Sequence, residues 1–294
     1  MQYRILGKTS LHVSVIGLGT WQFGGEWGKS FTAADVAAIV HRAGDLGINL
    51  IDTAECYGDH LAESLIGPAI AGRREKWFIA TKFGHKFHGM MNRSEPRSGP
   101  EVMQQLEDSL RALGTDYVDI YQYHSVRNSE FDDVPLREAL QKAKKQGKIR
   151  HIGVSISPPD NMHQTDGATA ADVEVIQVLY NRLERKAEAA VLPSCQRQNL
   201  GVLARVPLAS GYLSGKYQPG VKFAADDWRS GHNPADVAAK LTEVARIMRE
   251  EVPPGVPVAC WALAWCLKNP AVTSIIPGCK TVEQLEANCE AVGG

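Results

Sequence analysis

Short apolar runs alternate with longer stretches of helical periodicity along most of the chain. Each apolar run ends at glycine or polar residues, as buried strands do, and most are followed by apolar positions at helical spacing. The run Val175-Ile176-Gln177-Val178-Leu179 suits a parallel sheet that is covered on both faces. The pattern predicts eight strands, at residues 15–18, 49–52, 77–81, 118–123, 151–154, 174–179, 201–206 and 274–276.

The stretches between the strands predict helices, several of which have recognisable ends. Thr32 followed by Asp35 is a capping signal, and Gly47 can adopt the left-handed conformation that ends a helix. Gly114 and Gly147 end two later helices in the same way. The predicted helices cover residues 33–47, 60–71, 100–113, 134–146, a short segment ending near 171, then 188–199, 258–267 and 282–291.

Eight strand and helix units in 294 residues favour a closed (β/α)8 TIM barrel over an open doubly wound sheet. We predict one domain over residues 1–294. Residues 3–15 hold two alternating runs and predict an N-terminal β-hairpin that closes the floor of the barrel. The segment 210–233 is too long for an ordinary connection and predicts a lid or binding loop. The helix predicted at 234–251 is extra to the eight.

Composition and charge narrow the classes of partner. The chain is 44% apolar, which excludes a disordered protein, and its 32 Lys and Arg against 33 Asp and Glu leave no charge excess to attract polyanions. We expect no nucleic acid and no membrane as partners. The first residues lack the layout of a secretory signal, and the six cysteines lack metal spacing, so we expect a cytoplasmic protein with reduced thiols.

Candidate chemistry lies at the ends of the predicted strands, where the active sites of such barrels are found. The second strand delivers Asp52 and, five residues on, Tyr57; the third delivers Lys82 and the fourth His124. A buried Lys beside an Asp can stabilise a phenolate, and we expect it to draw the tyrosine pKa from about 10 toward neutrality. Such a tyrosine can protonate the oxygen of a carbonyl that receives hydride, while His124 orients it.

Each of these residues also has a structural interpretation. Asp52 could cap a turn, Tyr57 could lie on the rim, Lys82 could pair with another carboxylate, and His124 could be a buried core histidine. Their joint occurrence at strand ends favours the catalytic interpretation.

At these residues the sequence resembles the aldo-keto reductase superfamily. The similarity includes Gly17-Leu18-Gly19-Thr20-Trp21, Asp52-Thr53-Ala54-Glu55-Cys56-Tyr57-Gly58, Ala80-Thr81-Lys82, and Ile276-Pro277-Gly278 with Asn288. It implies a (β/α)8 barrel that binds NADPH without a Rossmann domain. It also implies the catalytic set Asp52, Tyr57, Lys82 and His124. Gly278 makes the chain similar to the microbial and potassium-channel-subunit branches.

The resemblance also implies where the cofactor binds. Ser155 and Gln177 would meet the nicotinamide carboxamide, and residues 207–216 would cross the pyrophosphate. Lys280, beside a helix start, would meet a 2′-phosphate, which favours NADPH over NADH. The implied cofactor-binding residues are Gly19, Thr20, Trp21, Asp52, Ser155, Gln177, Pro207, Leu208, Ser210, Gly211, Leu213, Gly215, Lys216, Ile276, Gly278, Lys280, Gln284 and Asn288.

Two positions depart from the family pattern. Ile156 stands where many members carry Asn, and Ser125 follows the histidine where many carry an acidic residue. Aromatic residues in the strand-end loops predict a pocket for ring-shaped or sugar-like carbonyl compounds. The predicted substrate-binding residues are Trp21, Trp27, Tyr57, Phe83, His124 and Trp228. Further candidate lining residues are Phe23, Phe87, Gln22, His85, His88, Arg127 and Arg229.

The leading hypothesis is an NADPH-dependent reductase of aldehydes or ketones, a monomer or weak homo-oligomer, with Tyr57 as proton donor. A cofactor-binding regulatory subunit with little turnover is the alternative. A Schiff-base lyase is a third hypothesis, although Asp52 would keep Lys82 protonated. Metal hydrolysis is weaker, because His85, His88 and His124 lack a carboxylate-bearing ligand motif, and we expect no metal.

Overall fold

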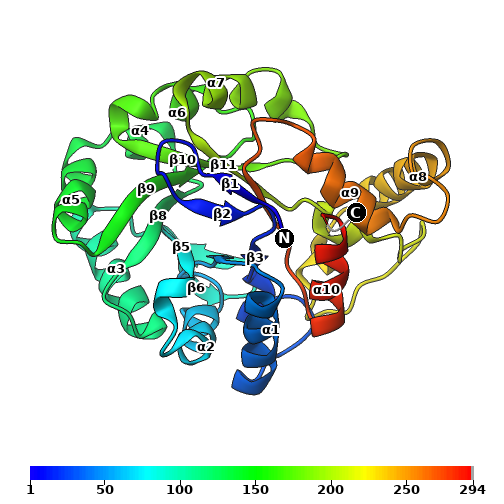
Figure 1. Cartoon of the computed structure of the whole chain (residues 1–294), viewed down its shortest axis with the longest axis horizontal. Helices are drawn as coiled ribbons and strands as arrows, with labels where there is room; N and C mark the ends of the chain where they lie inside the picture. Colours follow the sequence, from blue (N-terminus) through cyan, green and yellow to red (C-terminus); the bar gives the residue numbers. More distant parts are fainter. Residues whose placement is uncertain (293–294) are drawn as a thin grey trace.

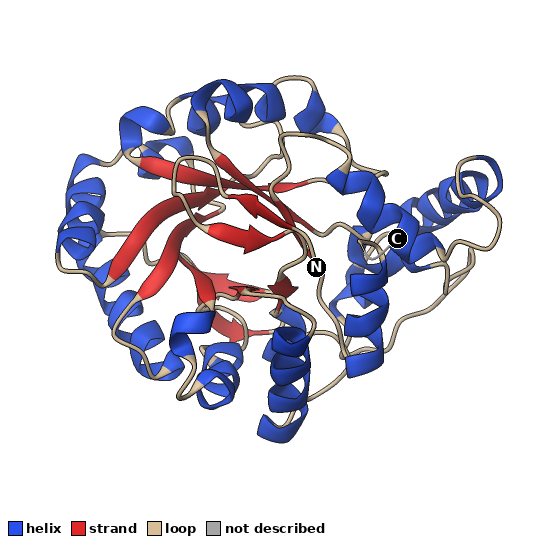
Figure 2. Ribbon diagram, in the orientation of Figure 1, coloured by secondary structure: helices blue, strands red, loops and turns tan. Residues whose placement is uncertain are grey.

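The computed structural model describes residues 1–292 as a barrel of parallel strands surrounded by helices (Figures 1 and 2). One 8-stranded sheet has the order β12-β11-β10-β9-β8-β5-β4-β3, and every paired strand runs parallel to its neighbour. The strands are β3 (Leu18–Gly19), β4 (Leu50–Asp52), β5 (Phe78–Phe83), β8 (Val118–His124), β9 (Ile149–Ser155), β10 (Val173–Leu179), β11 (Gly201–Arg205) and β12 (Ser274–Ile276).

The first and last strands meet and close the barrel. Parallel bridges join Ile16 to Ile275 and Gly19 to Gly278, and the Gly17 amide donates to the Ile275 carbonyl at 2.8 Å. A side chain at Gly19 would place its Cβ only 2.6 Å from the Ile276 carbonyl oxygen, so close approach requires glycine there. The predicted (β/α)8 barrel is confirmed.

The helices fall close to the predicted ranges. Thr32 and Asp35 form the predicted capping box, and Gly47 follows the helix with φ 83°. The helices are α1 (Ala33–Asp45), α2 (Leu61–Ile70), α3 (Gly99–Leu113), α4 (Asn128–Phe131), α5 (Val134–Lys145), α6 (Met162–Asp166), α7 (Val191–Gln198), α8 (Pro234–Glu250), α9 (Val258–Leu267) and α10 (Val282–Glu290). The predicted extra helix is present as α8, and it lies at the periphery of the barrel (Figure 1).

The predicted N-terminal hairpin closes one end of the barrel. Strands β1 (Tyr3–Ile5) and β2 (His12–Ser14) pair antiparallel and cross the front of the barrel in Figure 1. Leu6 and Val13 are fully buried in one apolar cluster with Leu50, Ile120 and Leu203, which point into the barrel. Because this end is filled with apolar side chains, ligands must bind at the opposite end.

Three features differ from the predicted elements. A second hairpin, β6 (Lys86–Gly89) with β7 (Asn92–Ser94), follows β5, and its mixed polar and aromatic residues gave no clear strand alternation. The short helix α4 also carries too few turns for a periodic pattern. The helix predicted to end near residue 171 is divided into α6 and a 3-10 turn at Thr169–Ala171.

Among residues 1–292 no helix is long and apolar enough to cross a membrane. All six cysteines are free thiols in the structure, and five of them are buried.

Candidate active site

The interior of the barrel changes from apolar to polar along its axis. Strands place alternate residues inside, so Leu50 and Asp52 on β4 face the same way, as do Ala80 and Lys82 on β5. The first residue of each pair joins the apolar cluster above the hairpin, and the second lies at the carboxyl end of its strand. The strand period therefore brings the ionisable residues together at the open end.

Lys82 is the centre of this polar layer. Its Nζ donates to Asp52 Oδ2 at 2.8 Å, to the Thr53 carbonyl at 2.7 Å and to the Tyr57 hydroxyl at 3.2 Å. The side chain is fully buried. Burial opposes its charge, but Asp52 and Tyr57 outweigh that effect and raise the pKa of Lys82. The lysine is therefore an ammonium ion, not the neutral amine that a Schiff base requires.

Asp52 is held from two sides. Its Oδ2 accepts from Lys82, while Oδ1 accepts from Gln177 Nε2 at 2.7 Å and from Gln122 Nε2 at 3.3 Å. The two amides come from β10, which lies across the barrel from β4, and from β8, which is separated from β4 by β5 alone. The carboxylate thus links three strands and orients the ammonium group toward Tyr57.

Tyr57 differs from the sequence-based expectation. Burial raises the pKa of Tyr57 to about 12; Lys82 acts in the lowering direction and offsets this only in part. The prediction that the pKa falls toward neutrality was wrong, because Asp52 neutralises much of the lysine charge and the phenol is poorly solvated. The hydroxyl is therefore protonated at neutral pH, and the nearby ammonium group can stabilise the phenolate that proton loss would leave.

His124 lies next to Tyr57 as a neutral imidazole. Burial lowers the pKa of His124 well below its usual value, and His85, Lys82 and Arg205 act in the same direction. The rings of His124 and Tyr57 are 6.3 Å apart, edge to face. Its Nδ1 lies 3.7 Å from the Cys56 sulfur. A neutral imidazole in this position can donate or accept a hydrogen bond without adding charge.

A buried carboxyl lies behind these groups. Glu55 Oε1 accepts from the His85 amide at 2.9 Å, and Oε2 has no partner in the described chain. Burial raises the pKa of Glu55 to about 8. Glu63 lies further out, fully buried, and accepts from Thr81 at 2.5 Å and from His60 at 2.5 Å. The segment that carries Tyr57 therefore rests on two buried carboxyl groups.

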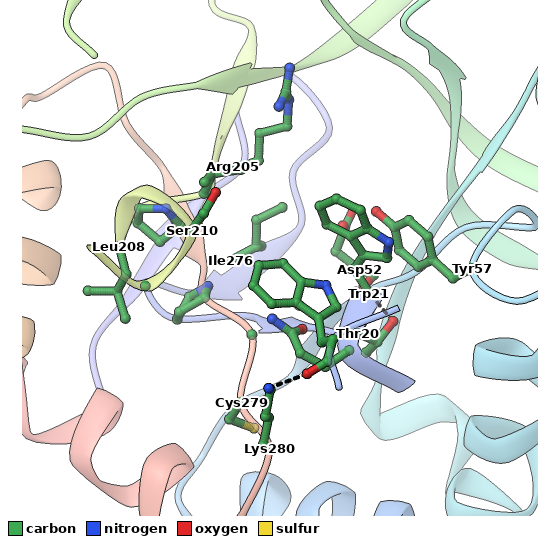
Figure 3. A pocket seen from close by; sticks show the side chains of 18 of the residues that line it. Thr20, Trp21, Asp52, Tyr57, Arg205, Leu208, Ser210, Ile276, Cys279 and Lys280 are labelled. Atoms are coloured by element: carbon green, nitrogen blue, oxygen red, sulfur yellow. Dashed lines mark hydrogen bonds between the residues drawn. The ribbon is translucent and has the colours of Figure 1, made fainter. Parts of the chain in front are cut away.

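A cavity of about 590 Å³ opens from this polar layer along one side of the barrel end. Figure 3 shows Trp21, Asp52 and Tyr57 on one side of it, Leu208 and Ser210 on the other, and Lys280 below them. The lining includes these predicted residues: Gly19, Thr20, Trp21, Trp27, Asp52, Tyr57, His124, Gln177, Pro207, Leu208, Ser210, Gly211, Lys216, Ile276, Gly278, Lys280, Gln284 and Asn288.

Two loops cover the outer part of the cavity. Residues 26–28 bond to residues 226–228 through the Gly28 amide to the Asp226 carbonyl at 3.1 Å and the Trp228 amide to the Glu26 carbonyl at 3.0 Å. Arg229 holds this strap, with two bonds to Asp227 at 2.8 and 2.6 Å and one to the Ser210 carbonyl at 3.1 Å. The predicted role of segment 210–233 as a lid or binding loop therefore agrees with its place over the cavity.

The backbone is unusual in the segment that directly follows β11 and leads into residues 210–233. Val206, Ala209 and Ser210 have φ of 56°, 50° and 59°, in the left-handed region that non-glycine residues rarely adopt. Each such residue costs on the order of 1–3 kcal/mol and is typical of a ligand-binding segment. A curved backbone of this kind presents amide groups to anions. Together with Lys216 and Lys280 in the same cavity, it suits a diphosphate-bearing cofactor.

Several predicted residues lie outside the cavity lining. Phe83 is fully buried and packs on Tyr121 and Tyr123, each at 4.8 Å between ring centroids, so its assignment to the substrate pocket was wrong. Its position on β5 points it outward, opposite to Lys82. Phe23 is likewise core, 5.0 Å from Phe31.

The remaining predicted residues stand behind the lining. The Ser155 hydroxyl points to Gln177 Oε1 at 3.4 Å. Leu213 is buried among apolar side chains of α8, and Gly215 lies against Val258. Trp228 supports the wall, with ring centroids 4.9 Å from Trp21 and 5.5 Å from Trp27. Lys82 is also absent from the cavity lining, but it contacts Asp52 and Tyr57, which do line the cavity.

The rim candidates divide between the cavity and the surface. Gln22, His85 and Arg229 line the cavity. Arg127 instead pairs with Glu130 at 2.6 Å on the surface, and His88 bonds to Ser94 at 2.7 Å on the hairpin β6–β7.

Arg93 and Arg205 are the charged lining residues that sequence reasoning missed. Arg93 lies on β7 and bonds to Glu26 at 2.5 Å, and the same carboxylate accepts from Trp21 Nε1 at 2.8 Å. Its hairpin had no recognisable pattern. Arg205 ends β11, so a basic residue at a strand end was the signal available for it. Other lining residues not predicted are Cys56, Ser125, Val206, Tyr217, Ala259 and Ala287.

One group of side chains could reach a single metal ion. The ligand atoms of Glu55, Cys56 and His124 lie within 4.8 Å of one another. However, the charges of Arg93 and Lys82 act on the same thiol, and burial raises its pKa, so both factors oppose binding of a cation. The expectation of a metal-free site remains a prediction.

The fold and the site together define a class of protein. A (β/α)8 barrel whose open end holds a buried Asp–Lys pair against a tyrosine hydroxyl, beside an elongated cavity, is suited to proton transfer on a bound small molecule. The model of the aldo/keto reductase family matches residues 15–293.

Individual proteins are similar over the whole chain. Aldo-keto reductase YhdN of Bacillus subtilis (strain 168) is 33% identical over 100% of this chain and 89% of its own. A probable voltage-gated potassium channel subunit beta of Arabidopsis thaliana is 30% identical over 99% and 91%. The structure of aldo-keto reductase AKR11C1 from Bacillus halodurans (holo form) superposes with a TM-score of 0.83 at 30% identity, over 100% and 91%.

The chain therefore belongs to the aldo/keto reductase family. Members of this family are oxidoreductases that act on small carbonyl compounds and generally bind a nicotinamide cofactor.

Proposed function

We propose that this protein reduces an aldehyde or ketone to the alcohol with NADPH, and that Tyr57 donates the proton. The observation that carries the proposal is the hydrogen bond of 3.2 Å from buried Lys82 to the Tyr57 hydroxyl, at the inner end of the cavity. The aldo/keto reductase family membership supports the same class of reaction.

In the proposed reaction Tyr57, Lys82 and His124 have different roles. A nicotinamide held in the cavity would supply the hydride for the carbonyl carbon, so that negative charge would develop on the carbonyl oxygen. Tyr57 gives its phenolic proton to that oxygen, so the C=O bond becomes C–OH. Lys82, held by Asp52, stabilises the phenolate that remains until solvent returns a proton. Neutral His124 donates a hydrogen bond that orients the carbonyl.

The proposed cofactor site uses the length of the cavity. Gln177 would hold the nicotinamide end, the left-handed segment at Ala209 and Ser210 with Lys216 the diphosphate, and Lys280 a 2′-phosphate. Lys280 Nζ donates to the Trp27 carbonyl, a neutral partner that a phosphate could replace. The choice of NADPH over NADH rests on this lysine.

The proposed substrate class follows from the inner lining. Trp21 and Tyr57 provide aromatic surface, and His85, Arg93 and Ser125 provide polar groups around the reactive centre. The Nδ1 atom of His85 is buried without a partner in the described chain, so a substrate hydroxyl could satisfy it. We expect sugar-like or aromatic carbonyl compounds to fit this combination.

We also propose that residues 1–294 act as one domain in the cytoplasm, as a monomer or weak homo-oligomer. The free thiols support a reducing compartment.

The decisive experiment follows NADPH absorbance with two panels of substrates, aromatic aldehydes and keto-sugars. We expect steady oxidation with at least one compound, and NADP⁺ reduction when the product alcohol is in excess. Tight NADPH binding without oxidation by any carbonyl would favour the alternative, a cofactor-binding regulatory subunit, for which the similarity to the potassium channel subunit beta is the supporting observation.

A further inference from the structure

Arg205 occupies a special position among the cations of the cavity. It is the last residue of β11, two residues after Leu203, which points into the barrel, so its side chain faces the interior as well. In the sheet register it lies between Leu179 of β10 and Ile276 of β12. Both the register and the cavity lining put its guanidinium at the inner part of the open end.

Three other cations in or next to the cavity each pair with a carboxylate, whereas the Arg205 guanidinium has no such pair among the described residues. Lys82 pairs with Asp52 at 2.8 Å, Arg93 with Glu26 at 2.5 Å, and Arg229 with Asp227 at 2.6 Å. In the described chain Arg205 donates a single long bond, from Nη2 to the Ile156 carbonyl at 3.4 Å, and its Nε has no partner. Its charge is therefore not neutralised by a carboxylate of its own.

The charge of Arg205 reaches the reactive groups. It interacts with Tyr57 and Asp52, and it lowers the pKa of His124. Burial lowers the pKa of Arg205 itself, but a guanidinium stays protonated at physiological pH. The positive charge is thus a permanent feature of the cavity, and it acts on Tyr57, Asp52 and His124.

We propose that Arg205 makes this site bind the reduced nicotinamide more tightly than the oxidised one, so that NADPH is loaded preferentially and NADP⁺ is released readily after the reaction. The proposal rests on the proposed function. The hydride goes to the carbon and the proton to the oxygen of one C=O bond, so the nicotinamide must lie near the Tyr57 hydroxyl. The charge of Arg205 acts on this hydroxyl. Loss of the hydride leaves the ring with one more positive charge, which an unneutralised guanidinium repels.

The same charge also acts on the substrate. Negative charge develops on the carbonyl oxygen during reduction, and a neighbouring cation stabilises it. In the reverse reaction the site would start with an oxidised, positively charged ring, which Arg205 disfavours. One side chain without a carboxylate partner would thus favour loading of NADPH and stabilise the alkoxide that forms on the substrate, although it opposes the positive charge left on the ring.

The test measures dissociation constants of NADPH and NADP⁺ by isothermal titration, without turnover. We expect Arg205→Gln to lower the preference for NADPH over NADP⁺ about tenfold, because the repulsion is removed. Arg205→Lys keeps the charge and should retain most of the preference. Thermal melting of each variant verifies that it is folded.

Lys216→Gln is the matched control. Lys216 lines the outer part of the cavity, where the phosphates carry the same charge in both forms of the cofactor. Its removal should weaken NADPH and NADP⁺ equally. An unchanged preference in Arg205→Gln, or an equal loss in Arg205→Lys, would overturn the proposal. If neither cofactor binds the wild-type protein, the proposed function fails instead.

Discussion

The two ends of the cavity are built from different kinds of structure. At the inner end, Asp52, Lys82 and His124 are carried by strands β4, β5 and β8, whose ladder of backbone bonds positions each side chain. At the outer end, the lining comes from loops that are held together by Arg229, Asp227 and a few backbone bonds. Residues whose distances must stay fixed for a reaction are therefore carried by strands of the sheet. Residues that only bind a ligand are carried by loops, which can separate to admit it.

The largest expected effect concerns the inner end. Tyr57→Phe removes the proposed proton donor while keeping the ring, so we expect kcat to fall about 1000-fold with NADPH affinity nearly unchanged. Steady-state kinetics and cofactor titration measure the two quantities. Tyr217→Phe is the control at the outer end, where the hydroxyl bonds only to Arg229 at 3.1 Å. Full turnover by Tyr57→Phe would remove the proton-donor assignment.

The next largest effect is expected on cofactor affinity at the outer end of the cavity. Lys280→Ala removes the cation proposed for the 2′-phosphate, so NADPH affinity should fall at least about tenfold while NADH affinity stays nearly constant. Titration with both cofactors tests this. Lys222→Ala removes an exposed lysine of the 210–233 segment and should change neither value. Equal losses for NADPH and NADH would contradict the assignment.

Weakening the strap should make the outer end of the cavity more mobile and leave the mobility of the inner end unchanged. Arg229→Met removes the guanidinium that joins Asp227, Tyr217 and the Ser210 carbonyl. We expect faster amide hydrogen exchange in residues 207–231 and cofactor affinity reduced by several-fold, with exchange in β8 unchanged. Arg246→Met, on the exposed face of α8, is the control. Equal acceleration in β8 would show that the ends are not independent.

The last expected effect is on stability and not on activity or binding, and it arises behind the inner end. Burial raises the pKa of Glu55 to about 8 from 4.5, so the folded protein holds this proton more tightly than the unfolded chain. Stability is then lost as pH rises from about 4.5 to 8, by up to about 1.4 kcal/mol for each pH unit. Glu55→Gln should therefore lose less stability between pH 5 and pH 9 than the wild type.

Urea unfolding at both pH values measures this difference. Glu283→Gln, at the exposed start of α10, is the control and should follow the wild type. Parallel pH curves for the wild type and Glu55→Gln would contradict a protonated Glu55.

The strand-borne part of the site could be predicted because strand ends converge in a barrel. Asp52, Lys82 and His124 each stand at the end of an apolar run, and they meet as expected. Phe83 was misassigned because a single residue step on β5 turns a side chain from the interior to the outer core. Arg93 could not be predicted, because its hairpin depends on the contact with Glu26, which is 67 residues away.

By itself the sequence determined the order of strands and helices, their caps and the residues that end each strand, since periodicity and turn chemistry are local. Only the tertiary structure decided the protonation of Tyr57, the pairing of the strap loops and the absence, among residues 1–292, of a carboxylate partner for Arg205. These properties depend on burial and on which distant charges become neighbours, and neither is encoded in the spacing of residues along the chain.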